Sequence, residues 1–131
     1  MVKMETSGQR RSGFTLIELL VSMAVIALLV SLAAPRYFSS MEKAQETALR
    51  ENLRQVREAI DKHVGDTGRY PDTLGDLVSK GYLRRPPVDP ITDSETTWIL
   101  VPPKEPGQGG LYDVRSGAPG LSRDGSAYGT W

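Results

Sequence analysis

The stretch Gly13-Phe14-Thr15-Leu16-Ile17-Glu18 opens an apolar run that continues to Ala34. The run from Phe14 to Ala34 has 21 residues, and Glu18 is the only charged one among them. Because an α-helix rises about 1.5 Å per residue, such a run covers roughly 30 Å, the thickness of the hydrocarbon core of a bilayer. The stretch therefore predicts a membrane-inserted helix with a small domain after it.

The carboxylate of Glu18 is unusual in this setting. A charged group at the centre of a membrane helix costs about 2.5–3.5 kcal/mol on insertion scales, and less near a helix end. Two interpretations follow. Glu18 either extends to the headgroups and has no further role, or it meets a positive charge supplied by another molecule or by a newly made chain end.

The leader, residues 1–13, is short and polar, with three basic side chains and one acidic one. The positive-inside rule places such a segment in the cytoplasm. An ordinary secretory signal is cleaved after its apolar region, at a small-residue site. Here Ala33-Ala34 is a poor site because Pro35 follows it directly. The junction of interest therefore lies before the apolar run, at Gly13-Phe14.

Residues 13–20, Gly-Phe-Thr-Leu-Ile-Glu-Leu-Leu, resemble the leader junction of type IV pilins and of the pseudopilins of type II secretion systems. In these families a prepilin peptidase cuts after the Gly and methylates the new N-terminal Phe, and the Glu pairs with the free amine of a neighbouring subunit. The resemblance implies processing at Gly13 and Phe14 and an assembly role for Phe14, Glu18 and Pro35. On the residues alone, Pro35 either ends the span or interrupts a helix that resumes after it.

Composition limits the function classes. A chain of 131 residues allows one membrane segment and one modest domain. Without the leader, 13 Lys and Arg face 15 Asp and Glu, so no global charge bias favours nucleic acid. The chain has no Cys and one His, and it shows no nucleophile–base pair or phosphate-binding loop. We therefore expect a protein that is not an enzyme.

A second helical pattern covers residues 39–64. Apolar residues recur at three- and four-residue steps, the period of one helical face: Met41, Ala44, Ala48, Leu49, Leu53, Val56, Ile60 and Val64. The opposite face carries charges spaced for i,i+4 pairs: Glu46–Arg50, Arg54–Glu58 and Glu58–Lys62. His63 reads as an ordinary residue near the helix end, and Gly65 and Gly68 provide a stop.

The remainder predicts a small mixed domain. Asp72 or Thr73 can cap a short helix over residues 74–80. Three prolines in residues 86–90 exclude a helix there and indicate an ordered loop over the long helix, with a polyproline recognition segment as the alternative. Residues 96–101 and 110–116 have strand composition, and a third short strand is predicted near Tyr128. The predicted fold class is α+β, with a long N-terminal helix packed on a small antiparallel sheet.

These later segments resemble the major pseudopilin of type II secretion systems, in the same order along the chain: Tyr70-Pro71, Gly81-Tyr82-Leu83, Pro87-Val88-Asp89-Pro90 and residues 112–117, Tyr-Asp-Val-Arg-Ser-Gly. The resemblance implies a pilin-like fold with a cleaved cytoplasmic leader (1–13), a transmembrane and assembly helix (14–35) and a periplasmic globular domain (36–131). It also implies an inner-membrane subunit that polymerises into a periplasmic pseudopilus for protein export. The implied partners are copies of itself, other pseudopilins, the prepilin peptidase, the inner-membrane assembly platform and the lipid bilayer.

Two other functions compete with secretion. A subunit of a type IV pilus or DNA-uptake filament shares the leader junction, but a DNA-binding subunit needs clustered basic and aromatic residues, and Arg84-Arg85 is the only adjacent basic pair after the leader. No nucleic-acid partner is therefore expected. A signal-anchored domain that forms no polymer leaves Glu18 and the Gly13-Phe14 junction without a role.

The family resemblance also suggests calcium. Major pseudopilins hold a calcium ion in the C-terminal loop, and calcium takes six to eight oxygen ligands. The candidate ligands in this chain are Asp113, Ser116, Ser122, Asp124 and Ser126. Only one carboxylate follows Asp113, so ordinary turn-stabilising Asp and Ser side chains are the alternative.

Overall fold

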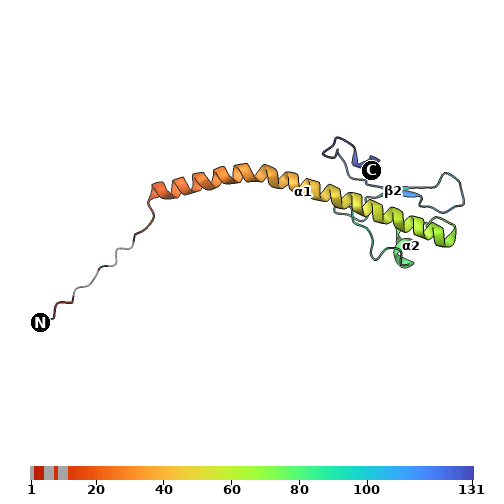
Figure 1. Cartoon of the computed structure of the whole chain (residues 1–131), viewed down its shortest axis with the longest axis horizontal. Helices are drawn as coiled ribbons and strands as arrows, with labels where there is room; N and C mark the ends of the chain where they lie inside the picture. The colour runs from red at the N-terminus through yellow and green to blue at the C-terminus, as the bar shows by residue number, and fades with distance from the viewer. Residues whose placement is uncertain (1, 5–7, 9–11) are drawn as a thin grey trace. The chain divides into compact units, whose positions relative to one another are not determined.

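A single helix carries both helical patterns of the sequence. The computed structural model describes residues 2–4, 8 and 12–131, with α1 and the elements that follow it drawn in Figure 1. The chain divides into two compact units between Phe38 and Ser39. Helix α1, Leu16–Thr67, has 52 residues and contains Pro35. The helix continues past Pro35 without interruption, so the proline neither ends nor breaks α1.

The first unit is an apolar helical segment with exposed side chains. No side chain in residues 12–38 is buried. Within the described residues, α1 is the one helix that is long and apolar enough to cross a membrane, with a mean hydropathy of 2.6 over its most apolar window. The hydroxyls of Ser22 and Ser31 donate to the carbonyls of Glu18 and Ala27, both at 2.8 Å. These polar groups are therefore satisfied inside the helix, as an apolar surrounding requires.

The core of the second unit forms on one face of α1. This face buries Leu49, Leu53, Val56, Ala59, Ile60 and His63, and the rest of the chain adds Leu77, Trp98, Leu111, Val114, Ala118 and Tyr128. The predicted stripe is confirmed from Leu49 onward. Its first members, Met41, Ala44 and Ala48, are exposed. Met41 and Ala44 precede the part of α1 that the domain covers, which begins at Glu46, whereas Ala48 lies within that part but outside the buried face.

His63 is part of this core and not an ordinary residue at the helix end. Its ring is 3% exposed. The Nδ1 atom lies 2.8 Å from the carbonyl oxygen of Arg69, and Nε2 lies 3.3 Å from Nζ of Lys80. Since a carbonyl only accepts, Nδ1 carries the proton and Nε2 accepts from the ammonium group. His63 therefore connects the end of α1 to Lys80, the residue that follows the next helix.

Helix α2, Leu74–Ser79, confirms the predicted short helix, and Thr73 is its N-cap. The Thr73 hydroxyl accepts from the Asp76 amide, while the Asp76 carboxylate accepts from the Thr73 amide, both at 3.2 Å. This reciprocal capping box satisfies two N–H groups that the helix itself leaves without partners. After the helix, Gly81 has a φ of 81°, a left-handed conformation in which glycine is unstrained.

The sheet is smaller than predicted. Strands β1, Ile99–Val101, and β2, Asp113–Arg115, pair antiparallel with Leu100 opposite Val114. Near Tyr128 the chain forms the 3₁₀ helix η1, Tyr128–Thr130, so the predicted third strand is wrong. A 3₁₀ turn places residues i and i+3 on one side. Tyr128 and Trp131 accordingly pack edge to face, with ring centroids 5.2 Å apart, which alternating strand geometry would prevent.

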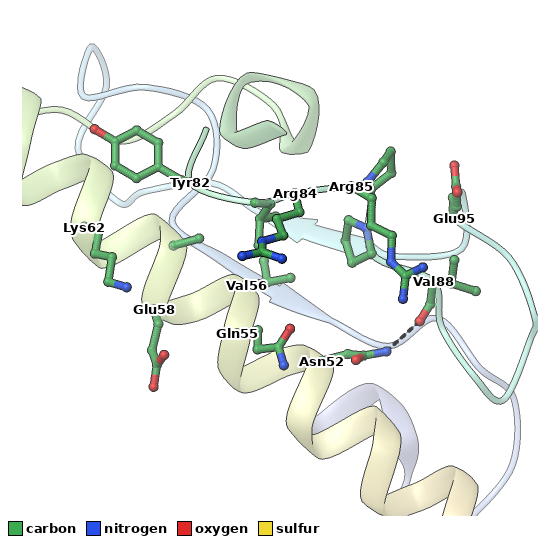
Figure 2. A pocket seen from close by; sticks show the side chains of 14 residues that line it. Asn52, Gln55, Val56, Glu58, Lys62, Tyr82, Arg84, Arg85, Val88 and Glu95 are labelled. Carbon is green, nitrogen blue, oxygen red and sulfur yellow. Dashed lines mark hydrogen bonds between the residues drawn. The ribbon is translucent and has the colours of Figure 1, made fainter. Parts of the chain in front are cut away.

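The proline-rich segment is an ordered loop over α1, as predicted. The side-chain amide of Asn52 donates to the Val88 carbonyl at 2.8 Å (Figure 2). The indole of Trp98 donates to the Pro87 carbonyl at 2.9 Å. The fully buried carboxylate of Asp89 accepts from the Ile91 amide at 2.9 Å and from the Ser116 hydroxyl at 2.5 Å. Backbone carbonyls that proline leaves without a ladder partner are thus satisfied by side chains.

Candidate functional site

The first candidate site is the N-terminal end of α1. The Thr15 hydroxyl accepts from the Glu18 amide at 3.2 Å, and Oε2 of Glu18 accepts from the Thr15 amide at 3.1 Å. Thr15-Leu16-Ile17-Glu18 is therefore a capping box, with the anionic side chain at the positive end of the helix. The Thr-x-x-Glu spacing before an apolar run is itself a sequence signature of a helix N-terminus. Glu18 thus has a local role besides any role in assembly.

The predicted processing junction lies directly before this cap. Gly13 and Phe14 are outside the helix, and the Phe14 side chain is 91% exposed. Apart from its two chain neighbours, no described residue has a heavy atom within 4 Å of the position where a side chain at Gly13 would begin. Within the described residues, nothing therefore shields the Gly13-Phe14 bond.

Pro35 lies inside α1, one turn before the boundary between the units. It is followed by two exposed aromatic side chains, Tyr37 and Phe38, whose ring centroids are 5.9 Å apart. Exposed aromatic rings at the end of an apolar span are typical of a membrane–water interface.

The candidate calcium residues fall into separate groups. Ser122, Asp124 and Ser126 lie together: both hydroxyls donate to Oδ1 of Asp124, and the Ser126 amide donates to it at 2.9 Å. Asp113 instead accepts from Nε of Arg57 at 2.8 Å. Ser116 is fully buried and donates to Asp89.

This arrangement does not fit calcium. Calcium takes six to eight oxygen ligands, usually with several carboxylates. Here Asp124 is the one carboxylate among the three clustered residues, and its Oδ2 lies 3.6 Å from the guanidinium of Arg50. Within the described residues, no group of three or more His, Cys, Asp or Glu side chains could hold a metal ion. The geometry favours the alternative, a turn stabilised by Asp and Ser.

The hydrogen bonds to Asp124 set its ionisation. The pKa of this carboxyl lies well below its ordinary value, chiefly because the Ser122 hydroxyl donates to the ionised form, followed by the hydroxyl and amide of Ser126. The nearby Arg50 guanidinium adds a smaller effect in the same direction. Asp124 is therefore an anion over the whole physiological pH range.

Contacts between α1 and the C-terminal segment, residues 121–131, were missed by the sequence analysis. Oε1 of Glu46 accepts from the Arg123 amide at 2.8 Å and from the Tyr128 hydroxyl at 3.1 Å. Arg50 faces Asp124 and not Glu46. Of the three predicted i,i+4 pairs, the described residues form only Arg54–Glu58. Local spacing did not reveal partners that lie more than 70 residues away in sequence.

A groove of about 890 Å³ lies between α1 and the loop after α2 (Figure 2). Its charged lining is mixed: Lys62, Arg84 and Arg85 stand with Glu58 and Glu95. A channel for nucleic acid presents a continuous basic surface with stacking aromatic rings. The groove has two carboxylates and a single tyrosine, Tyr82, so its geometry does not match such a channel.

Comparisons with known proteins agree with the N-terminal geometry. Residues 8–34 match the family described as the prokaryotic N-terminal methylation motif. Type II secretion system core protein G of Pectobacterium carotovorum subsp. carotovorum is 33% identical over 138 residues, covering 90% of this chain and 85% of the relative.

The corresponding protein of Klebsiella pneumoniae is 32% identical and covers 94% of this chain and 96% of the relative. That of Escherichia coli (strain K12) is 29% identical, covering 84% and 83%. The comparison with solved structures gave no match. Because the likeness spans both the N-terminal motif and the domain that follows it, the chain belongs to the family of type II secretion system core protein G.

Proposed function

We propose that the protein is a structural subunit of a type II secretion pseudopilus, which polymerises through its N-terminal helix and drives protein export across the outer membrane. The observation that carries the proposal is the similarity to core protein G over nine-tenths of the chain. In this proposal residues 1–13 are a removed leader, residues 14–35 are the membrane and assembly segment, and residues 36–131 form a periplasmic domain.

The first step is processing. A prepilin peptidase cuts the exposed bond between Gly13 and Phe14 and methylates the new amine of Phe14. The basic leader stays in the cytoplasm, so α1 enters the inner membrane with the second unit on the periplasmic side. The inner-membrane assembly platform, other pseudopilins and the lipid bilayer are the remaining partners.

The second step is assembly, in which the Glu18 carboxylate receives the Phe14 amine of a neighbouring copy. Oε2 of Glu18 is used by the helix cap, while Oε1 makes no hydrogen bond to the described residues. One carboxylate can therefore cap its own helix and still accept a charged donor from outside. The pairing also offsets the cost of holding an anion in an apolar surrounding.

The proposed processing is tested by intact-mass and N-terminal analysis of the protein from membranes with and without prepilin peptidase. We expect a chain that begins at methylated Phe14 only where the peptidase is active. Gly13→Leu is the matched control, because it alters the junction and leaves the capping box in place. A wild-type chain that keeps its leader beside an active peptidase would contradict the proposal.

The proposed assembly is tested by two substitutions that separate charge from capping. Glu18→Gln retains a side chain able to close the capping box, whereas Glu18→Ala removes both the cap and the charge. The chain has no cysteine, so a pair of cysteines introduced on two sides of the exposed first unit reports neighbouring subunits by disulfide cross-linking, one bond to each neighbour. We expect both variants to stay in the membrane without forming cross-linked ladders. Normal ladders from Glu18→Gln would show that the charge is not required.

The pilus alternative is tested by complementation. In a secretion-competent strain that lacks its own core protein G, the protein is expected to restore export of the strain's secreted enzymes. Surface pili without restored export would favour the pilus subunit instead.

A further inference from the structure

Three charged residues on one side of α1, named the charged stripe, contact the C-terminal segment, residues 121–131. Glu46, Arg50 and Arg57 are spaced by four and seven residues, which places them on the same side of the helix. Glu46 accepts from Arg123 and Tyr128. Arg57 donates from Nη2 to the carbonyl oxygens of Val114 at 3.1 Å and Trp131 at 2.8 Å. Each residue of the charged stripe therefore contacts the end of the chain.

Arg50 stands in the middle of the charged stripe and closes a ring of contacts. Its guanidinium carbon lies 3.8 Å from the centroid of the Trp131 ring, and Nη2 lies 3.6 Å from Oδ2 of Asp124. The Trp131 indole donates to the Ser126 hydroxyl at 2.8 Å, and that hydroxyl donates to Asp124. The four side chains thus form a closed circuit in which one cation touches both an aromatic face and a carboxylate.

We infer that the Arg50 guanidinium is the built-in cation that fastens the C-terminal segment to α1, so that this segment docks without a divalent metal ion. A bound cation would have to approach Asp124, whose Oδ1 accepts three hydrogen bonds and whose Oδ2 faces Arg50. The planar guanidinium also stacks on Trp131, which a hydrated metal ion does not do in this way. Docking of this segment occurs within one chain and does not depend on filament formation.

Trypsin cleavage after Arg123 measures how often the C-terminal segment leaves α1. Arg123 is exposed, but its amide is bonded to Glu46, so cleavage after Arg123 requires the segment to leave the helix. When opening and closing are fast, the cleavage rate follows the population of the open form. The experiment measures release of the peptide 124–131 by mass spectrometry, using the full chain in detergent, in 2 mM calcium chloride or 5 mM EDTA.

We expect Arg50→Gln to speed release of this peptide about three- to tenfold, the range set by a cation–π contact together with an exposed ion pair. Arg50→Lys should fall between this variant and the wild type, because it keeps the charge without the planar stacking. Arg54→Gln is the matched control: it removes an equally exposed arginine on α1 whose partners, Glu51 and Glu58, lie within the helix.

Trp131→Leu gives a second test should Arg50→Gln unfold the domain. It should also speed release, and the effect of the double variant should be smaller than the product of the two single effects, since both remove the contact between Arg50 and Trp131. Wild-type release should be equal in calcium and in EDTA. Release slowed by calcium in the wild type but not in Asp124→Asn would establish a metal site and overturn the inference, as would an Arg50→Gln rate equal to that of the wild type.

Discussion

Gly117 is the position where one added methyl group should do the most damage. A Cβ placed there would lie 1.8 Å from the carbonyl oxygen of Thr97 and 3.0 Å from its carbonyl carbon. Non-bonded carbon and oxygen atoms do not approach closer than about 3 Å, so in Gly117→Ala the two chain segments must separate by roughly 1 Å.

The segment around Thr97 has little freedom to yield. The Thr97 hydroxyl lies 2.6 Å from that of Thr92, and the neighbouring Trp98 donates to Pro87. Overpacking of this kind costs about 1–3 kcal/mol. For a domain of this size each kcal/mol lowers the melting temperature by about 4–8 °C, so we expect a drop of roughly 5–20 °C.

The measurement is the melting temperature of the full chain in detergent. Unfolding is monitored through the near-ultraviolet circular dichroism of its tryptophans. Gly65→Ala is the matched control, because this glycine lies inside α1 with no atom within 4 Å of the new Cβ. The Gly65→Ala substitution should raise the free energy of unfolding by about 0.5–1 kcal/mol, because alanine has the higher helix propensity. If Gly117→Ala melted within 2 °C of the wild type, the close approach of Gly117 to Thr97 would be refuted.

Three further outcomes are expected. Leu53→Ala, at a site 2% exposed, should lower the free energy of unfolding by about 2–5 kcal/mol in a urea titration, whereas the same truncation at exposed Leu121 should change it by less than about 0.5 kcal/mol. Thr73→Ala should cost about 1 kcal/mol by loss of the α2 cap, and Thr73→Ser should restore most of it; equal melting of the two variants would contradict the capping role. Burial, and then the hydrogen bond to Glu46, raise the pKa of Tyr128 above its ordinary 10.0, so its contribution to stability is complete below pH 10 and is lost as pH rises through the higher folded value. The hydrogen bond to Asp66 also raises the pKa of Tyr82, so an absorbance titration at 295 nm should show two late phenols, of which Tyr128→Phe removes one.

The sequence predicted the features that depend on local pattern. The apolar run and the amphipathic stripe gave the long helix, and Thr73 lies at a position that favours a cap. Met41 and Ala44 belong to the predicted stripe but are exposed, because periodicity shows which residues share a face and not how far the domain extends along it. The 3₁₀ turn at Tyr128 depends on packing against Trp131, and strand propensity does not report such a contact.

The candidate sites also divide into one that a local motif predicts and one that depends on contacts between distant residues. Gly13, Phe14 and Glu18 were identified from a contiguous motif, and the matched methylation motif covers them. The fastening of the C-terminal segment by Glu46, Arg50 and Arg57 joins residues 74–82 positions apart, so no local spacing could reveal it. Charged residues on a helix surface look alike in sequence whether they face solvent or a distant segment.

The position of Tyr128 in the core has a consequence for how the protein is made. Its ring packs into a core whose other members begin at Leu49, and its hydroxyl reaches Glu46, 82 residues earlier. Contacts of such long sequence separation form late, after the cost of closing a large loop has been met. Until residues 128–131 have been synthesised, the apolar core face of α1 lacks part of its partner. The second unit should therefore complete its core only after synthesis has passed Tyr128, and a chain that stalls short of Tyr128 should expose that face to chaperones and proteases.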